Sequence, residues 1–191
     1  MKAQSLGKLY GRLAVSAYDV ITGKRVYHVQ KRNQITNAGR IVVLDLLAQL
    51  PEVDPDDYEP QRHPEWNQIW SLSVGSDSTP AAASQTTLVA PLLTIQLEIP
   101  VERAKVDANF EIQVVAEVAA GTGTGDTFAE AGLFTRGRAD GILPGDPLSP
   151  YGTWETIDDR RMYARQTYPS FTKGATMRVV YEWTLGMTIS A

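Results

Sequence analysis

The residues of this sequence that could do chemistry fall in three short segments, and two of them lack a necessary partner. The segment 121–127, GTGTGDT, is glycine-rich like a phosphate-binding loop, which also needs a Lys, then Ser or Thr, at a helix start. Asp126 stands where that cation is needed, and strand-like residues follow. Ser170 and Lys173 have the spacing of a lysine-activated serine, but they lie in a tight link between two predicted strands. We therefore expect a plain inter-strand loop and no catalytic serine.

The third segment is acidic and could hold a cation. Within 51–68, PEVDPDDYEPQRHPEWNQ, three aspartates are followed by Glu65, which comes eleven residues after Asp54. An EF-hand loop needs glycine at its sixth position for the sharp turn, and this sequence has Glu59 there. The segment therefore predicts a solvated acidic loop, with a loose calcium site as the alternative.

Histidine and cysteine, which supply most zinc ligands and many catalytic nucleophiles, are scarce. The chain has no cysteine and only two histidines, His28 and His63, far apart and without a partner at metal-ligand spacing. A Ser-His-Asp triad assembles in space and leaves no fixed spacing, but no nucleophile elbow is visible. We expect no catalytic residues, no metal, no cofactor and no enzymatic activity.

Composition bounds the class of protein. The 191 residues suit one domain, and 43% apolar with 21% charged residues is ordinary globular composition. A net charge of −4 argues against a general nucleic-acid binder. The N-terminus lacks the apolar core of a signal peptide, and no run of about 18 apolar residues could span a membrane. The sequence predicts a soluble protein made in the cytoplasm, with neither nucleic acid nor membrane as partner.

The periodicity of the chain favours strands around a single helix. A hairpin is expected over 8–32, and further strands over 69–190 bring the total to about eight. The helix is expected over about 36–50, capped by Thr36 or Asn37 and stopped by a proline. We predict an all-β protein, an antiparallel β-sandwich of jelly-roll-like type, in a single domain over 1–191.

The predicted helix has an apolar stripe that includes Ile41, Val43 and Leu44. A lone amphipathic helix must bury its stripe, so we expect it to cover one open end or face of the sandwich. Pairing with the same helix of another subunit is the alternative.

Two long proline-rich loops, 51–68 and 137–160, contain aromatic residues and show neither helix nor strand periodicity. Such residues either anchor contacts with other proteins or fold back over the core. We predict subunit contacts in both loops, made by Tyr58, Trp66, Tyr151 and Trp154.

Four segments, in this order, resemble recurring motifs of tailed-bacteriophage virion proteins. They are NQITNAGRIVVLDLLAQ (33–49), LSVGSDSTPAAASQTTL (72–88), FAEAGLFTRG (128–137) and MYARQTYPSFTKGATMRVVYEWTL (162–185). The motifs they match are N-x-I-T-x-x-G, a strand ending in G-S-D-x-T, E-A-G-L-F, and M-x-A-R leading into a final strand. The long loops 51–68 and 137–160 look like insertions relative to shorter members.

The resemblance implies a virion structural protein of the tail, baseplate, collar, neck or fibre. Its expected partners are other virion proteins and copies of itself, as a homo-oligomer, and its expected location is the virion, after synthesis in the host cytoplasm. A capsid decoration protein and a host-surface or carbohydrate-binding module, with a glycan as partner, are the alternatives. A sandwich hydrolase is a third class, which lacks any supporting constellation.

Overall fold

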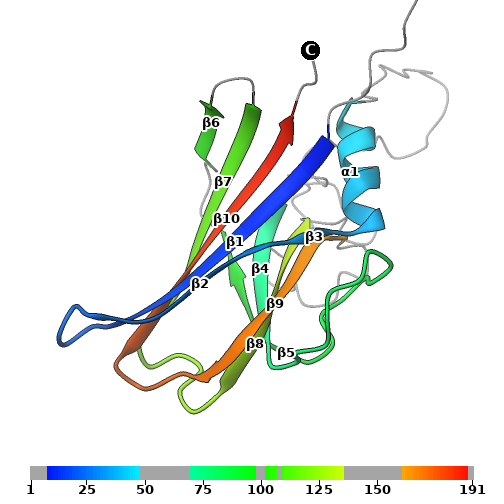
Figure 1. Ribbon diagram of the computed structural model, residues 1–191. Coiled ribbons are helices and arrows are strands. Elements are labelled where there is room, and N and C mark those ends of the chain that lie inside the picture. Colours follow the sequence, from blue (N-terminus) through cyan, green and yellow to red (C-terminus); the bar gives the residue numbers. More distant parts are fainter. Residues whose placement is uncertain (1–7, 48–68, 98–101, 107–108, 136–160, 189–191) are drawn as a thin grey trace, which may run out of the picture.

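The computed structural model describes residues 8–47, 69–97, 102–106, 109–135 and 161–188 (Figure 1). These residues form ten strands and one helix. In chain order the elements are β1 (Lys8–Asp19), β2 (Arg25–Arg32), β3 (Gln34–Ile35), α1 (Asn37–Leu47), β4 (Ile69–Gly75), β5 (Pro91–Gln96), β6 (Glu102–Val106), β7 (Asn109–Val118), β8 (Thr127–Thr135), β9 (Met162–Thr172) and β10 (Met177–Thr188).

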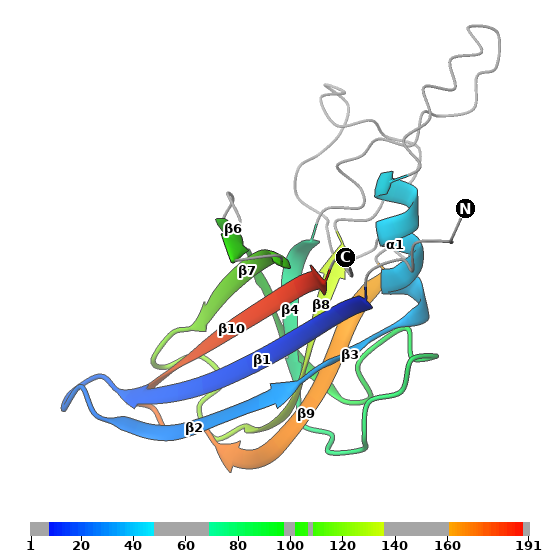
Figure 2. The same ribbon diagram turned by 45° about the horizontal axis from the view of Figure 1, so that its top comes forward.

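The strands form two antiparallel sheets of five strands each. Sheet A has the order β2-β1-β10-β7-β6, and sheet B has the order β3-β9-β8-β4-β5. Figures 1 and 2 show the sheets as two layers, with α1 beside β3 at one end of β9. The predicted all-β antiparallel sandwich with one helix is confirmed.

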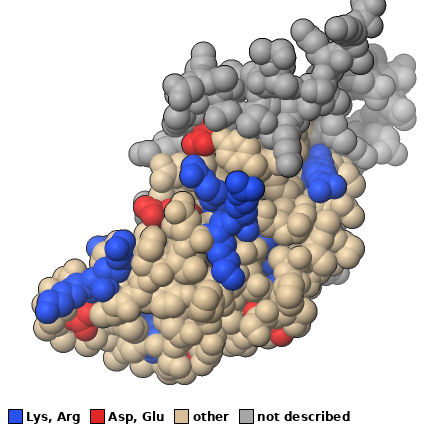
Figure 3. Space-filling view, viewed as in Figure 1, with Lys and Arg blue, Asp and Glu red and all other residues tan. Residues whose placement is uncertain are grey.

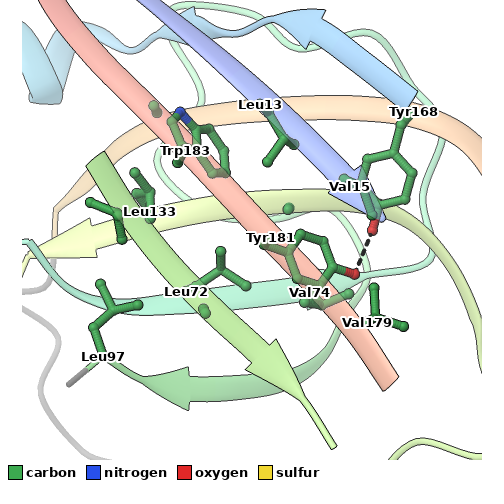
Figure 4. Close-up of a cluster of buried hydrophobic side chains, with 14 of the residues drawn as sticks. Leu13, Val15, Leu72, Val74, Leu97, Leu133, Tyr168, Val179, Tyr181 and Trp183 are labelled. Atoms are coloured by element: carbon green, nitrogen blue, oxygen red, sulfur yellow. Dashed lines mark hydrogen bonds between the residues drawn. The ribbon is translucent and has the colours of Figure 1, made fainter. Parts of the chain in front are cut away.

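The core lies between the sheets and follows from period-two alternation. On β10, Val179, Tyr181 and Trp183 are fully buried, whereas Arg178 before them and Glu182 among them are exposed. Figure 4 shows how the inward side chains of both sheets meet. They include Leu13 and Val15 from β1, Leu72 and Val74 from β4, Ala131 and Leu133 from β8, and Ala164 and Tyr168 from β9.

The segment 92–106 differs from the prediction. The sequence indicates one strand there, and the structure has two, β5 in sheet B and β6 in sheet A. Pro100 lies between them in the sequence, and proline cannot donate to a strand ladder. Alternation marks both pieces as strands but does not reveal that the chain changes sheets between them.

Helix α1 packs against β9, at the edge of sheet B. Val43 packs on the main core, as the predicted stripe requires, but Ile41 is 49% exposed and does not belong to the buried face. The side chains from Leu44 onward lie outside the described residues. No helix in the described part of the chain has the length and apolar content needed to cross a membrane.

Candidate functional site

A buried ion-pair cluster lies on the outer face of sheet B. It consists of Glu130 on β8, Arg165 on β9, and Asp77 and Gln85 in the connector 76–90 that joins β4 to β5. Glu130 and Arg165 are both 0% exposed, and the Arg165 Nη2 atom lies 2.7 Å from Glu130 Oε2. A buried charge is tolerated only where it is paired and hydrogen-bonded, so the rest of the cluster must satisfy both groups.

Each nitrogen of the Arg165 guanidinium has a polar partner. Nε donates to Glu130 Oε2 at 2.8 Å. Nη2 forms an ion pair with the same oxygen and donates to Asp77 Oδ1 at 3.5 Å. Nη1 donates to the Thr79 carbonyl at 3.0 Å and to Gln85 Oε1 at 2.9 Å. A guanidinium has five N–H donors. The guanidinium donates four hydrogen bonds here, and Nη2 also forms the ion pair with Glu130. The buried cation therefore holds the connector against the sheet.

The Glu130 carboxylate accepts hydrogen bonds from backbone amides at the other end of the connector. Its Oε1 accepts from the Ala90 amide at 2.8 Å, and its Oε2 accepts from the Val89 amide at 3.3 Å. Gly75 leaves the space for this carboxylate, because a Cβ there would lie 2.4 Å from Glu130 Oε1 and from the Ala90 carbonyl. The strand end before the connector therefore requires glycine for close approach.

A small apolar cluster lies beside the charges. Leu88 of the connector packs with Phe134 and Met162 on the outer face of sheet B. A Cβ on Gly132 would lie 3.0 Å from Leu88 Cδ2. The close neighbour of Gly132 on this face is therefore a connector side chain.

The start of α1 is attached to the same region through Thr36. The Thr36 hydroxyl donates to the Met162 carbonyl of β9 and accepts from the Gly39 amide at 3.0 Å, which makes Thr36 the N-cap. A Cβ on Gly39 would lie 2.1 Å from the Tyr163 carbonyl, so only glycine lets the helix approach this closely. The Asn37 amide donates to the Ala83 carbonyl at 2.7 Å, which joins the helix to the connector.

The four segments that carry the sequence resemblance therefore meet at one place. The T-x-x-G turn, the connector, the E-A-G strand and the M-x-A-R strand each contribute at least one of the contacts above. Sequence reasoning did not single out Glu130, Arg165 or Gln85. The available signal was a charged residue inside an otherwise apolar strand segment, since such a residue needs a buried partner.

The four predicted contact residues cannot be placed, because Tyr58, Trp66, Tyr151 and Trp154 lie outside the described residues. The acidic segment 51–68, with His63, lies outside them too. Within the described ranges, no three His, Cys, Asp or Glu side chains group to hold a metal ion.

The glycine-rich segment is a loop between β7 and β8, and a strand follows it instead of a helix. Gly121, Gly123 and Gly125 all have positive φ, which explains the spacing of the glycines without a phosphate. Ser170 is exposed near the end of β9, whereas Lys173 just beyond it is buried. Burial lowers the pKa of the Lys173 amine. Neither residue is helical, so the geometry of a lysine-activated serine is absent.

His28 lies on the exposed side of β2, with Nδ1 2.9 Å from the Ser16 hydroxyl. Among the described residues no carboxylate contacts this imidazole, so the pair lacks the third member of a catalytic triad. Searches for similar proteins were negative throughout, since no family model, curated protein or solved structure matches this chain.

Proposed function

We propose that this protein is a structural component of a tailed-phage virion, acting through subunit contacts in the tail, baseplate, collar or neck. One observation supports the proposal above others. The four segments that resemble virion-protein motifs, although spread over residues 33–185, build a single contact region on the outer face of sheet B.

This convergence matters because each motif alone is short and unspecific. Arg165 must bond Glu130, Gln85 and the Thr79 carbonyl together, so a change in one segment affects the contacts of the others. Residues that depend on one another in this way form a unit of structure, and a resemblance to the whole unit carries more weight than four separate matches. Because fold alone does not imply function, the proposal rests on this unit and not on the sandwich.

The test is made on particles of the phage or prophage whose genome encodes the chain. Particles are purified on a density gradient, and the peptides of this protein are quantified against the major capsid protein. We expect a fixed copy number per particle, with immunogold labelling on the tail or neck.

Abundant protein in the lysate, with none in purified particles, would rule the proposal out. Labelling of the head would instead support a capsid decoration protein. Binding of the isolated chain to host cells or glycans, without particle incorporation, would support the host-surface alternative.

A further inference from the structure

The outer face of sheet A is exposed, and its two halves differ in net charge. Because Leu13, Val15 and Ala17 of β1 point into the core, Arg12 on the same strand points outward. Register places Arg32 of β2 opposite Arg12 on this face.

The basic half consists of Arg12, Arg25 and Arg32 on β1 and β2. The acidic half has Glu111, Glu117 and Glu182 on β7 and β10. It also holds one cation, Arg178 on β10, which pairs with Glu117 at 3.1 Å, so its net charge is negative. Figure 3 shows Lys and Arg over the middle of the molecule and at the hairpin tip, with Asp and Glu beside them.

The basic half is under local electrostatic strain in the single chain. Arg12 and Arg32 are directly opposite across antiparallel strands, an arrangement that like charges destabilise. The nearest carboxylate that can offset this repulsion is Glu111, whose Oε1 lies 3.8 Å from Arg12 Nη2. In the described part of the chain, Arg32 has no acidic partner, and Glu182 on the other half has no basic one. A partner that brings carboxylates to the basic half and cations to the acidic half would pair the charges of both halves.

The middle of the face is suited to a flat contact. Ala14 and Ser16 on β1 are small, and Ser16 is only 4% exposed. On β7, Val115 is 53% exposed, so an apolar side chain lies among the charges. Apolar side chains that lie among charged ones are common in protein interfaces.

We propose that this face binds the same face of a second copy of the chain. The two-fold axis runs along the strands, between β1 and β10. Rotation about it places β2 of one copy over β7 of the other, and β1 over β10. The basic half of each copy then meets the acidic half of its partner, with Arg32 toward Glu111 and Arg12 toward Glu182. A two-fold contact of this kind is self-complementary, which is what closed homodimers require.

The size of the face fits this partner. Four strands about 4.8 Å apart, each about ten residues long at about 3.3 Å per residue, cover about 600 Å². Two copies would bury about 1,200 Å², at the lower end of stable protein contacts. We therefore expect a dimer that dissociates with dilution and with salt. The inference rests on the charges of sheet A alone and does not depend on the virion proposal.

The test measures the dimer dissociation constant of the full chain by sedimentation equilibrium in 50 mM and 500 mM NaCl. One variant reverses the basic half, Arg25→Glu with Arg32→Glu, and another reverses the acidic half, Glu117→Arg with Glu182→Arg. We expect each variant alone to dimerise at least about tenfold more weakly than the wild type. An equimolar mixture of the two should recover a heterodimer, because the halves are again complementary.

The matched control is Arg40→Glu, a charge reversal on the exposed side of α1. It should leave the dissociation constant within about twofold of the wild-type value. If a double variant melts early, the single changes Arg32→Glu and Glu182→Arg replace it. A wild-type chain that stays monomeric at 50 mM NaCl overturns the proposal. So does a dimer that both reversals leave unchanged, or a mixture that forms no heterodimer.

Discussion

Glu130 and Arg165 lie diagonally across neighbouring strands, since Gly132 is opposite Arg165, and both side chains are fully removed from water. Taking two such charges out of water costs several kcal/mol per ion, and the hydrogen bonds to the connector 76–90 offset that cost. The pair therefore does more than stabilise the sheet, because its geometry also fixes where the connector lies.

Removal of one partner should be far more costly than removal of both. We expect Arg165→Met or Glu130→Met to lower the free energy of unfolding by about 3–5 kcal/mol, since each leaves a buried charge unpaired. The double variant should lose much less than the sum of the two. Urea unfolding followed by far-UV circular dichroism supplies all corners of this double-mutant cycle.

The control for this cycle is the exposed pair of Arg178 and Glu117, whose side chains are both 45% exposed. Its removal, measured at 0.5 M NaCl, should cost less than about 1 kcal/mol. If the double variant at Glu130 and Arg165 loses the sum of the two single losses, as at the exposed pair, the two buried charges are not coupled.

At the scale of elements, α1 is attached through its first turn. The Thr36 hydroxyl accepts from the Gly39 amide and donates to the Met162 carbonyl of β9. One hydroxyl therefore fixes both the helix start and its position on sheet B. The helix has no acidic residue in its first turn and no basic residue in its last, so charge adds little to its stability.

We expect Thr36→Val, which keeps the shape and removes the hydroxyl, to lower the free energy of unfolding by about 1–2 kcal/mol. Thr36→Ser should restore most of the loss. Thr122→Val, in the exposed loop before β8, is the matched control and should change stability by less than about 0.5 kcal/mol. If Thr36→Val lowers the free energy of unfolding no more than the control does, the Thr36 cap does not stabilise the helix.

Local sequence accounts for the elements better than for the contacts between them. The alternation around Tyr181 and Trp183 predicts a strand with one buried face, and both side chains are fully buried. The partners of Arg165 could not be predicted, because Glu130 and Gln85 are distant in sequence and meet only once the sheet and connector are in place. The predicted contact residues in the long loops, Trp66 among them, stay predictions.

At the scale of the whole molecule, the two sheets share one core and are linked through it by polar groups. The hydroxyl of Tyr168 in sheet B lies 3.0 Å from that of Tyr181 in sheet A (Figure 4). Burial raises the pKa of both hydroxyls well above the usual value for tyrosine. Burial also raises the pKa of Tyr163 to about 12. The fold therefore holds these protons at a pH where the unfolded chain releases them.

This linkage predicts a loss of stability in alkali. Unfolded tyrosines ionise near pH 10. Between about pH 10 and 12 the folded protein binds more protons than the unfolded one, so the free energy of unfolding falls as pH rises. Each tyrosine that stays protonated in the fold contributes up to about 1.4 kcal/mol per pH unit to this slope. The contribution is absent below about pH 9, where both states keep their phenolic protons.

The variant that tests this linkage is Tyr168→Phe with Tyr181→Phe. It removes both hydroxyls together, and with them the 3.3 Å bond from the Tyr168 hydroxyl to the Glu130 carbonyl. At pH 7 its free energy of unfolding should stay within about 1 kcal/mol of the wild-type value, because paired polar groups replaced together cost little. Between pH 10 and 12 its slope should be shallower by up to about 2.7 kcal/mol per pH unit, twice the single contribution. Urea unfolding by circular dichroism gives both slopes, and tyrosinate absorbance should rise only as the fold is lost. Equal slopes in the two proteins, or tyrosinate absorbance that rises fully in the folded state, would show that these hydroxyls ionise without opening the core between the sheets.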